Sequence, residues 1–291
     1  MQKLERVIRV KKKRVPFIAL LLCLTLTAGA AVMTGWYPTM ALEPVGSEAT
    51  DAIDAASRAF DAAEPIFEKL KESVAQEIED YEDESSEDAS FEEIEELTRE
   101  LLGYVDQLDE LIYSLSGLPD DMNTSVGKTI RATRDYLIML RNMSADYAEL
   151  SQYATNLMNA LMVLDGISGD VDSYEELADM IYTTTGEALE LLNSFIPPDY
   201  ISVTQGDLCV RLQEFQDFSV DFYVAISMDD PLRLNSCVYR LSRISTLFEQ
   251  WAENLVSDLQ MQFTQAERRI NGPIGQLHDE LKSNLALLKA A

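Results

Sequence analysis

The chain is poor in residues that break helices and in residues that bind metals. Its 291 residues include only 12 glycines and 9 prolines, which disfavours a β-sandwich or barrel with turn signals every ~8 to 12 residues. The single histidine has no second histidine with which to build a zinc site, and no glycine-rich phosphate loop occurs. We therefore name no catalytic, cofactor-binding or metal-ligating residue, and we expect no cofactor and no enzymatic activity.

Basic residues are also scarce outside the N-terminus. The chain has 23 Lys and Arg against 51 Asp and Glu, a net charge of −28. Seven basic residues and one acidic residue fall within positions 1–15, so the rest holds 16 basic (23 − 7) and 50 acidic residues (51 − 1). Nucleic acid and anionic lipid need clustered Lys and Arg, so we expect neither at this surface. Self-repulsion in solution, a preference for cationic partners, and adaptation to a saline exterior remain open explanations of the acidity.

One long apolar run is present, at residues 16–37, directly after the basic residues 1–15. Its length suits one helical crossing of the ~30 Å hydrocarbon core, and the positive-inside rule keeps the N-terminus cytoplasmic. We predict a single-pass anchor in the cytoplasmic membrane, a tether at 38–48 and an extracytoplasmic body at 49–291. The alternative is a signal peptide cleaved after Ala30 or Ala41, which would leave a secreted protein.

The body shows helical periodicity almost throughout. Apolar residues alternate at spacings of three and four, which places them on one face of a helix. The longest such stripe runs through Tyr136, Leu140, Met143, Tyr147, Leu150, Ala154, Leu157, Leu161 and Leu164. We predict an all-α fold: an elongated antiparallel bundle of six to seven helices with coiled-coil-like seams. Mutating Leu150 and Leu157 to Asp should collapse it.

Several breaks divide these helices. Pro65 predicts a kink near Ala62 or a fresh helix start. Residues 79–90 are strongly acidic and predict a solvated loop; calcium is the alternative there, although the EF-hand glycine is missing. Asp230-Pro231 predicts a tight hairpin, with Asp230 as the helix cap. The Asn-Gly-Pro sequence within 271–275 predicts a stop or a sharp bend.

A few single residues carry further expectations. In a straight hairpin turning at Asp230, Cys209 and Cys237 lie too far apart for a disulfide, so we expect two separate thiols buried in helical faces, with a bent hairpin or an interchain bond as the alternative. We expect His278 at the surface or at an interface. Asn123 and Asn142 fit the glycosylation acceptor pattern, and Asn123 is the better candidate because it lies in a turn region.

Two functions fit this architecture. The leading one is a non-enzymatic scaffold, adaptor or assembly component that works through a protein partner or self-association. The alternative is an extracytoplasmic ligand-binding or sensing module, with a small molecule near Phe215, Phe218, Phe222 and Tyr223. In having one basic anchor and then long amphipathic helices, the chain resembles anchored helical extracytoplasmic domains of bacteria and archaea, including chemoreceptor sensory bundles. It departs from chemoreceptors in lacking a second crossing and a cytoplasmic signalling module.

Overall fold

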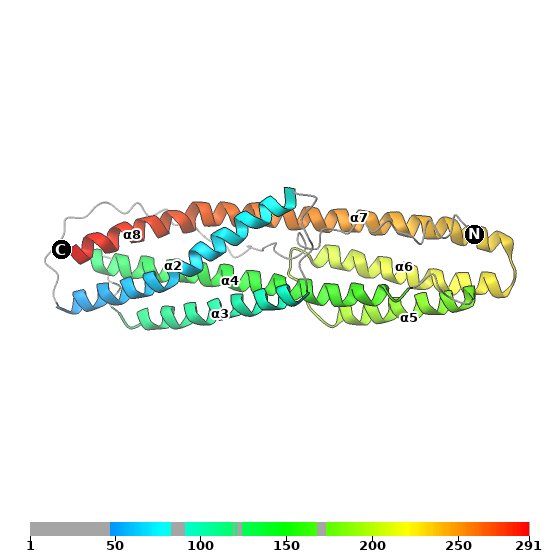
Figure 1. Ribbon diagram of the computed structural model, residues 1–291, viewed down its shortest axis with the longest axis horizontal. Coiled ribbons are helices and arrows are strands. Elements are labelled where there is room, and N and C mark those ends of the chain that lie inside the picture. The colour runs from blue at the N-terminus through cyan, green and yellow to red at the C-terminus, as the bar shows by residue number, and fades with distance from the viewer. Residues whose placement is uncertain (1–46, 83–90, 119, 121–123, 168–172, 291) are drawn as a thin grey trace. The chain divides into compact units, whose positions relative to one another are not determined.

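A computed structural model describes residues 47–82, 91–118, 120, 124–167 and 173–290. These residues are helical with no strand, and the helices pack against one another, which confirms the all-α class. Figure 1 shows the helices in order: α2 (Ser47–Glu82), α3 (Phe91–Leu115), α4 (Ser125–Leu164), α5 (Tyr174–Asn193), α6 (Ser202–Ser227), α7 (Pro231–Arg269) and α8 (Gly275–Ala290). The kinked turn η1 (Ile270–Ile274) joins α7 to α8.

The predicted membrane segment at 16–37 lies outside the described residues, as do most of the tether and positions 83–90 of the predicted acidic loop. Among the helices that the structure describes, none has the length and apolar character needed to cross a membrane.

The described residues fall into two compact units. Unit 1 is formed from residues 86–94 and 150–260, and unit 2 from residues 22–85, 95–149 and 261–291, as far as these are described. Helices α4 and α7 each contribute residues to both units. Each unit is therefore assembled from segments that are far apart in the sequence.

The apolar stripe predicted along α4 is buried over most of its length. The buried residues keep the predicted spacing through Tyr136, Leu140, Met143, Tyr147, Leu150, Ala154 and Leu157, whereas Leu161 and Leu164 are only partly buried. In α3, Ile94, Leu101, Leu108 and Leu115 are almost fully buried. The hydrophobic effect thus selects the face that each helix turns inward.

Helix α2 differs from the prediction in two respects. It continues through Pro65, so the alternative of a fresh helix start is wrong; burial of Ala63, Ile66 and Phe67 around the proline offsets the backbone hydrogen bond that it removes. It also extends to Glu82, so the first four residues of the predicted loop 79–90 belong to the helix.

The turns of unit 1 follow their local chemistry. Ser173 caps α5, since its Oγ accepts a hydrogen bond from the Glu176 amide at 3.1 Å. At the predicted α6–α7 hairpin, Asp230 Oδ1 accepts from the amides of Leu232 and Arg233. The preceding residue, Asp229, has φ of 50°. Its amide donates to the carbonyl of Ile226, and that of Asp230 donates to the carbonyl of Ala225, which is a Schellman motif.

The two body cysteines are separate free thiols, as predicted. Cys237 is buried in the core of unit 1, whereas Cys209 is only partly buried, so the expectation that both are buried is wrong for Cys209. The acceptor asparagine Asn142 lies within α4, where Ser144 of the same pattern is fully buried. Asn123 lies outside the described residues.

Candidate functional site

The candidate site lies in unit 2, at the break between α7 and α8. The predicted bend at 271–275 is confirmed: α7 ends at Arg269 and the chain passes through η1, where Gly272 has non-helical backbone angles. The break also requires Gly275, because a Cβ atom there would lie 2.7 Å from the Ile270 carbonyl oxygen. Helix α2 packs against both η1 and α8.

His278 occupies the centre of this region and is only 4% exposed. The expectation of a surface histidine is therefore wrong. Its ring stacks on Phe67 with centroids 4.3 Å apart and also lies against Phe60 at 5.0 Å. Its Nδ1 is 3.0 Å from the hydroxyl oxygen of Tyr136, a residue with no exposed surface. The burial of a polar ring between helices is thus offset by a hydrogen bond from α4.

An acidic and a basic group face the other side of the imidazole. Glu64 Oε1 lies 3.9 Å from His278 Nε2 and 2.6 Å from Lys282 Nζ. The carboxylate favours the proton on Nε2, so Tyr136 donates its hydroxyl hydrogen to Nδ1. Burial lowers the pKa of His278, against an opposing effect of Glu64. The hydrogen bond from Lys282 lowers the pKa of Glu64, so the neutral imidazole lies beside an ionised carboxylate.

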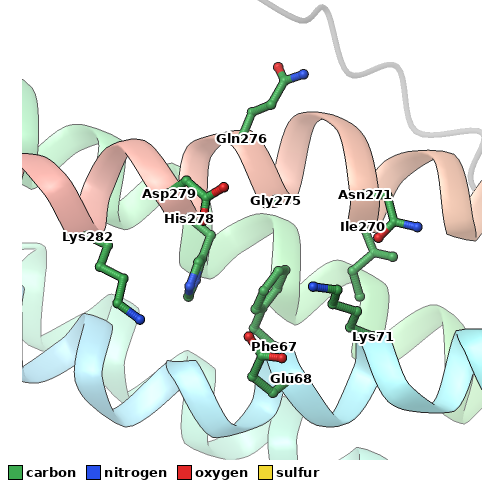
Figure 2. A pocket seen from close by; sticks show the side chains of 10 residues that line it. All are labelled: Phe67, Glu68, Lys71, Ile270, Asn271, Gly275, Gln276, His278, Asp279 and Lys282. Carbon is green, nitrogen blue, oxygen red and sulfur yellow. The ribbon is translucent and has the colours of Figure 1, made fainter.

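A cavity of about 270 Å³ opens beside this cluster. Figure 2 shows the side chains that line it, with Phe67 and His278 between the two helices and Gln276 pointing away from α2. From α2 come Phe67, Glu68 and Lys71; from the break and α8 come Ile270, Asn271, Gly275, Gln276, His278, Asp279 and Lys282. Most of these side chains are polar or charged, and they include both signs of charge. The cavity therefore suits a small polar solute better than an apolar one.

A second ionisable pair lies just before the break. Asp146 of α4 is half-buried, and its Oδ2 has no hydrogen-bond partner within the described part of the chain. Burial raises the pKa of Asp146 to about 7, although the charge of Arg269 at the end of α7 opposes the shift. This acid therefore titrates near neutral pH.

The aromatic residues considered for ligand binding lie elsewhere, in the core of unit 1. Phe218 and Phe222 are buried and stacked with centroids 5.6 Å apart, and Phe215 stacks on Phe218 at 6.0 Å. They pack with residues of α5 and α7, while Tyr223 remains 49% exposed. These rings fill a helix–helix core, and the cavity described above is in unit 2.

One sequence signal pointed to His278. The buried residues after the break are Ile274, His278, Leu281, Leu285 and Leu288, which alternate at four and three. Leu277, one position before His278, is only partly buried. The imidazole therefore replaces an apolar side chain in the seam. Within the described residues, no group of three His, Cys, Asp or Glu side chains is placed to hold a metal ion.

Comparison of the chain with protein-family models, with curated proteins and with solved structures found no match. The functional argument therefore rests on the geometry of the described residues.

Proposed function

We propose that this chain is a non-enzymatic, membrane-anchored extracytoplasmic protein whose helical bundle acts as a scaffold, adaptor or assembly component through protein–protein contacts. Residues 16–37 anchor it in the cytoplasmic membrane with the N-terminus inside, or act as a signal that is removed. The body is an elongated antiparallel bundle with coiled-coil-like seams. The spacing of the buried residues in α3 and α4 supports this arrangement.

The observation that carries the proposal is the outer face of α7 in unit 1. Residues 231–248 contain no Asp or Glu in a chain that has 51. Leu232 and Tyr239, seven positions apart and so on one face of the helix, are 82% and 72% exposed. Exposed apolar side chains on a helical segment that has no acids of its own favour contact with another protein. Such a contact also avoids the repulsion expected across the rest of an acidic surface.

A photo-crosslinking amino acid at position 239 of the full-length protein tests this proposal. Crosslinking in native membranes should give a discrete adduct, either with a second copy or with a partner. The matched control is position 287, where Leu287 of α8 is also exposed, at 55%. Leu232→Glu should remove the adduct at 239. A protein that stays monomeric, with no adduct at either position, would refute the contact.

The membrane assignment has its own test. The mass of the mature N-terminus, measured on protein isolated from its host, should correspond to retention of residues 16–37. Loss of the segment after Ala30 or Ala41 would replace the anchored protein by a secreted one.

The cavity beside His278 favours a second function, an extracytoplasmic ligand-binding or sensing module that works with a separate signalling or transport partner. A buried polar ring, ionisable side chains of both signs and a 270 Å³ space meet at one helix break. A thermal-shift screen of small polar metabolites tests this function. Stabilisation of wild-type protein that is lost in His278→Phe would support it, and a screen without a hit would count against it.

A further inference from the structure

We propose that the cavity beside His278 binds a small zwitterion, a molecule that carries an ammonium group and a carboxylate a few bonds apart, as amino acids and betaines do. The inference rests on the second proposed function and names the chemical class of its ligand.

The charges around the cavity are the first argument. Lys282 is already paired with Glu64 at 2.6 Å, so its charge is largely compensated. Glu68, Lys71 and Asp279 line the same space, and no ion pair joins any of them to another residue in the described part of the chain. One cation and two anions without an ion-pair partner thus line a single cavity, and the Lys71 ammonium lies over the Phe67 ring at 5.8 Å from its centroid. A ligand with both signs of charge can pair with Lys71 and with the carboxylates at once, whereas a simple anion is repelled by two carboxylates and a simple cation leaves Lys71 without a counter-ion.

The placement of these groups suggests an orientation for the ligand. Lys71 rises from α2 beside Phe67, on the side of the cavity that Asn271 and Ile270 line (Figure 2). An ammonium and an amide together donate several hydrogen bonds, which suits a carboxylate. The carboxylates of Glu68 and Asp279 then face the ligand's ammonium group. The two charged ends of the ligand would bridge α2 and α8.

His278 supplies the buried polar group. Its Nδ1 is bound to Tyr136, while Nε2 has only Glu64 nearby, at 3.9 Å, which is too long for a hydrogen bond. A water molecule held between the ring and the ligand can accept from this N–H. The only histidine of the chain thus lies in the wall of the cavity, with one ring nitrogen engaged and the other available.

Size limits the ligand. Pockets for drug-sized molecules measure ~300–1,000 Å³, and the present cavity, at about 270 Å³, lies below that range. Its rim charges are solvent-exposed, where ion pairs contribute little each. We therefore expect a small solute that binds with a dissociation constant on the order of 1 mM.

The single histidine makes the test direct. In full-length protein in detergent, without a histidine tag, the imidazole signal in the proton NMR spectrum belongs to His278 alone. Glycine betaine and L-serine are the zwitterionic probes, sodium acetate supplies a carboxylate alone, and methylammonium chloride an ammonium alone, all at matched ionic strength. The zwitterions should shift the imidazole signal saturably. The two single-charge probes should require at least tenfold higher concentrations.

Matched variants locate the binding. Lys71→Gln and Asp279→Asn should each weaken zwitterion binding at least fivefold. Lys69→Gln and Glu280→Gln change exposed neighbours on the same helices that do not line the cavity, and they should bind as wild type does. All four positions are exposed, so folding should survive each change. Equal binding by Lys71→Gln and wild type would overturn the proposed orientation and with it the inference.

The outcomes separate the ligand class from ligand binding itself. If acetate or methylammonium alone shifts the signal as readily as the zwitterions do, the cavity binds a ligand but the class proposed here is wrong. If no probe shifts the signal and the metabolite screen is also negative, the ligand-binding function fails together with this inference.

Discussion

Gly275→Ala should destabilise unit 2 although alanine is the better helix former. Gly275 is helical, with φ of −63° and ψ of −41°, so alanine alone would gain about 0.5–1 kcal/mol. Its Cβ, however, would lie 2.7 Å from the Ile270 carbonyl oxygen. Ordinary contact begins at 3.4 Å, so the backbone of η1 would have to move by about 0.7 Å (3.4 − 2.7). Such overpacking costs roughly 1–3 kcal/mol. We expect a net loss of about 1–2 kcal/mol.

Gly103→Ala is the matched control, because Gly103 is a helical residue of the same unit and its Cβ would meet nothing within 4 Å. It should gain about 0.5–1 kcal/mol. The free energy of unfolding of both variants is measured by urea unfolding, followed by circular dichroism and by the His278 imidazole signal, and their melting temperatures are measured by thermal unfolding. The melting temperature of Gly275→Ala should fall by roughly 2–8 °C. If Gly275→Ala proves as stable as Gly103→Ala, the Ile270 carbonyl does not approach Gly275 and the backbone described for η1 is wrong.

Three further predictions concern the hairpin, the seam and a buried acid. Asp229→Gly should raise the free energy of unfolding by about 0.5–1 kcal/mol, because φ of 50° suits glycine. Asp230→Ala should lower the free energy of unfolding by about 1 kcal/mol, because it removes the cap of α7. Equal effects of the two variants in thermal melts would contradict the Schellman turn. Leu157→Asp should lower the free energy of unfolding by about 3–5 kcal/mol, because the side chain is fully buried. Met162→Asp on the same helix should be nearly neutral, because Met162 is 59% exposed. If both variants keep the circular dichroism and melting of wild type, the inward face assigned to α4 is wrong. Burial raises the pKa of Asp146 to about 7 in the folded state, whereas in the unfolded state the carboxyl loses its proton near pH 4, so the free energy of unfolding should fall as pH rises from about 4 to 7. Asp146→Asn should remove this pH dependence and, at pH 8, be more stable than wild type by on the order of 1 kcal/mol, allowing for the partial exposure of the side chain. Identical profiles of stability against pH for the two proteins would refute this prediction.

Local pattern was enough to predict most of the helices. Burial repeats with the helical period, so the stripe from Tyr136 to Leu157 predicted the inward face of α4. Caps are equally local: Ser173 and Asp230 lie directly before the helices that they cap. The alternative of a fresh helix start at Pro65 was wrong, because the tolerance of a proline depends on the packing around it, which no local pattern contains.

The candidate site escaped prediction because it is assembled over long distances. The hydrogen-bond partner that makes burial of His278 possible is Tyr136, 142 positions away in the sequence. Without knowledge of that partner, a single histidine in a helix is expected at the surface. The close approach of Gly275 to Ile270 appears only once the backbone of η1 is placed. The division into two units depends on which distant segments pair, which the sequence leaves open.

The assembly of unit 2 from segments that are far apart in the sequence has a consequence for the order of folding. Its α2 segment is made early, but the α8 residues that pack on it are among the last of the 291, and the pair Glu64–Lys282 spans 218 positions. Contacts so distant in sequence form slowly. The part of the apolar face of α2 that α8 covers therefore stays exposed longer than the part that contacts Tyr136 of α4. During that interval the net negative charge of the chain after residue 15 opposes aggregation.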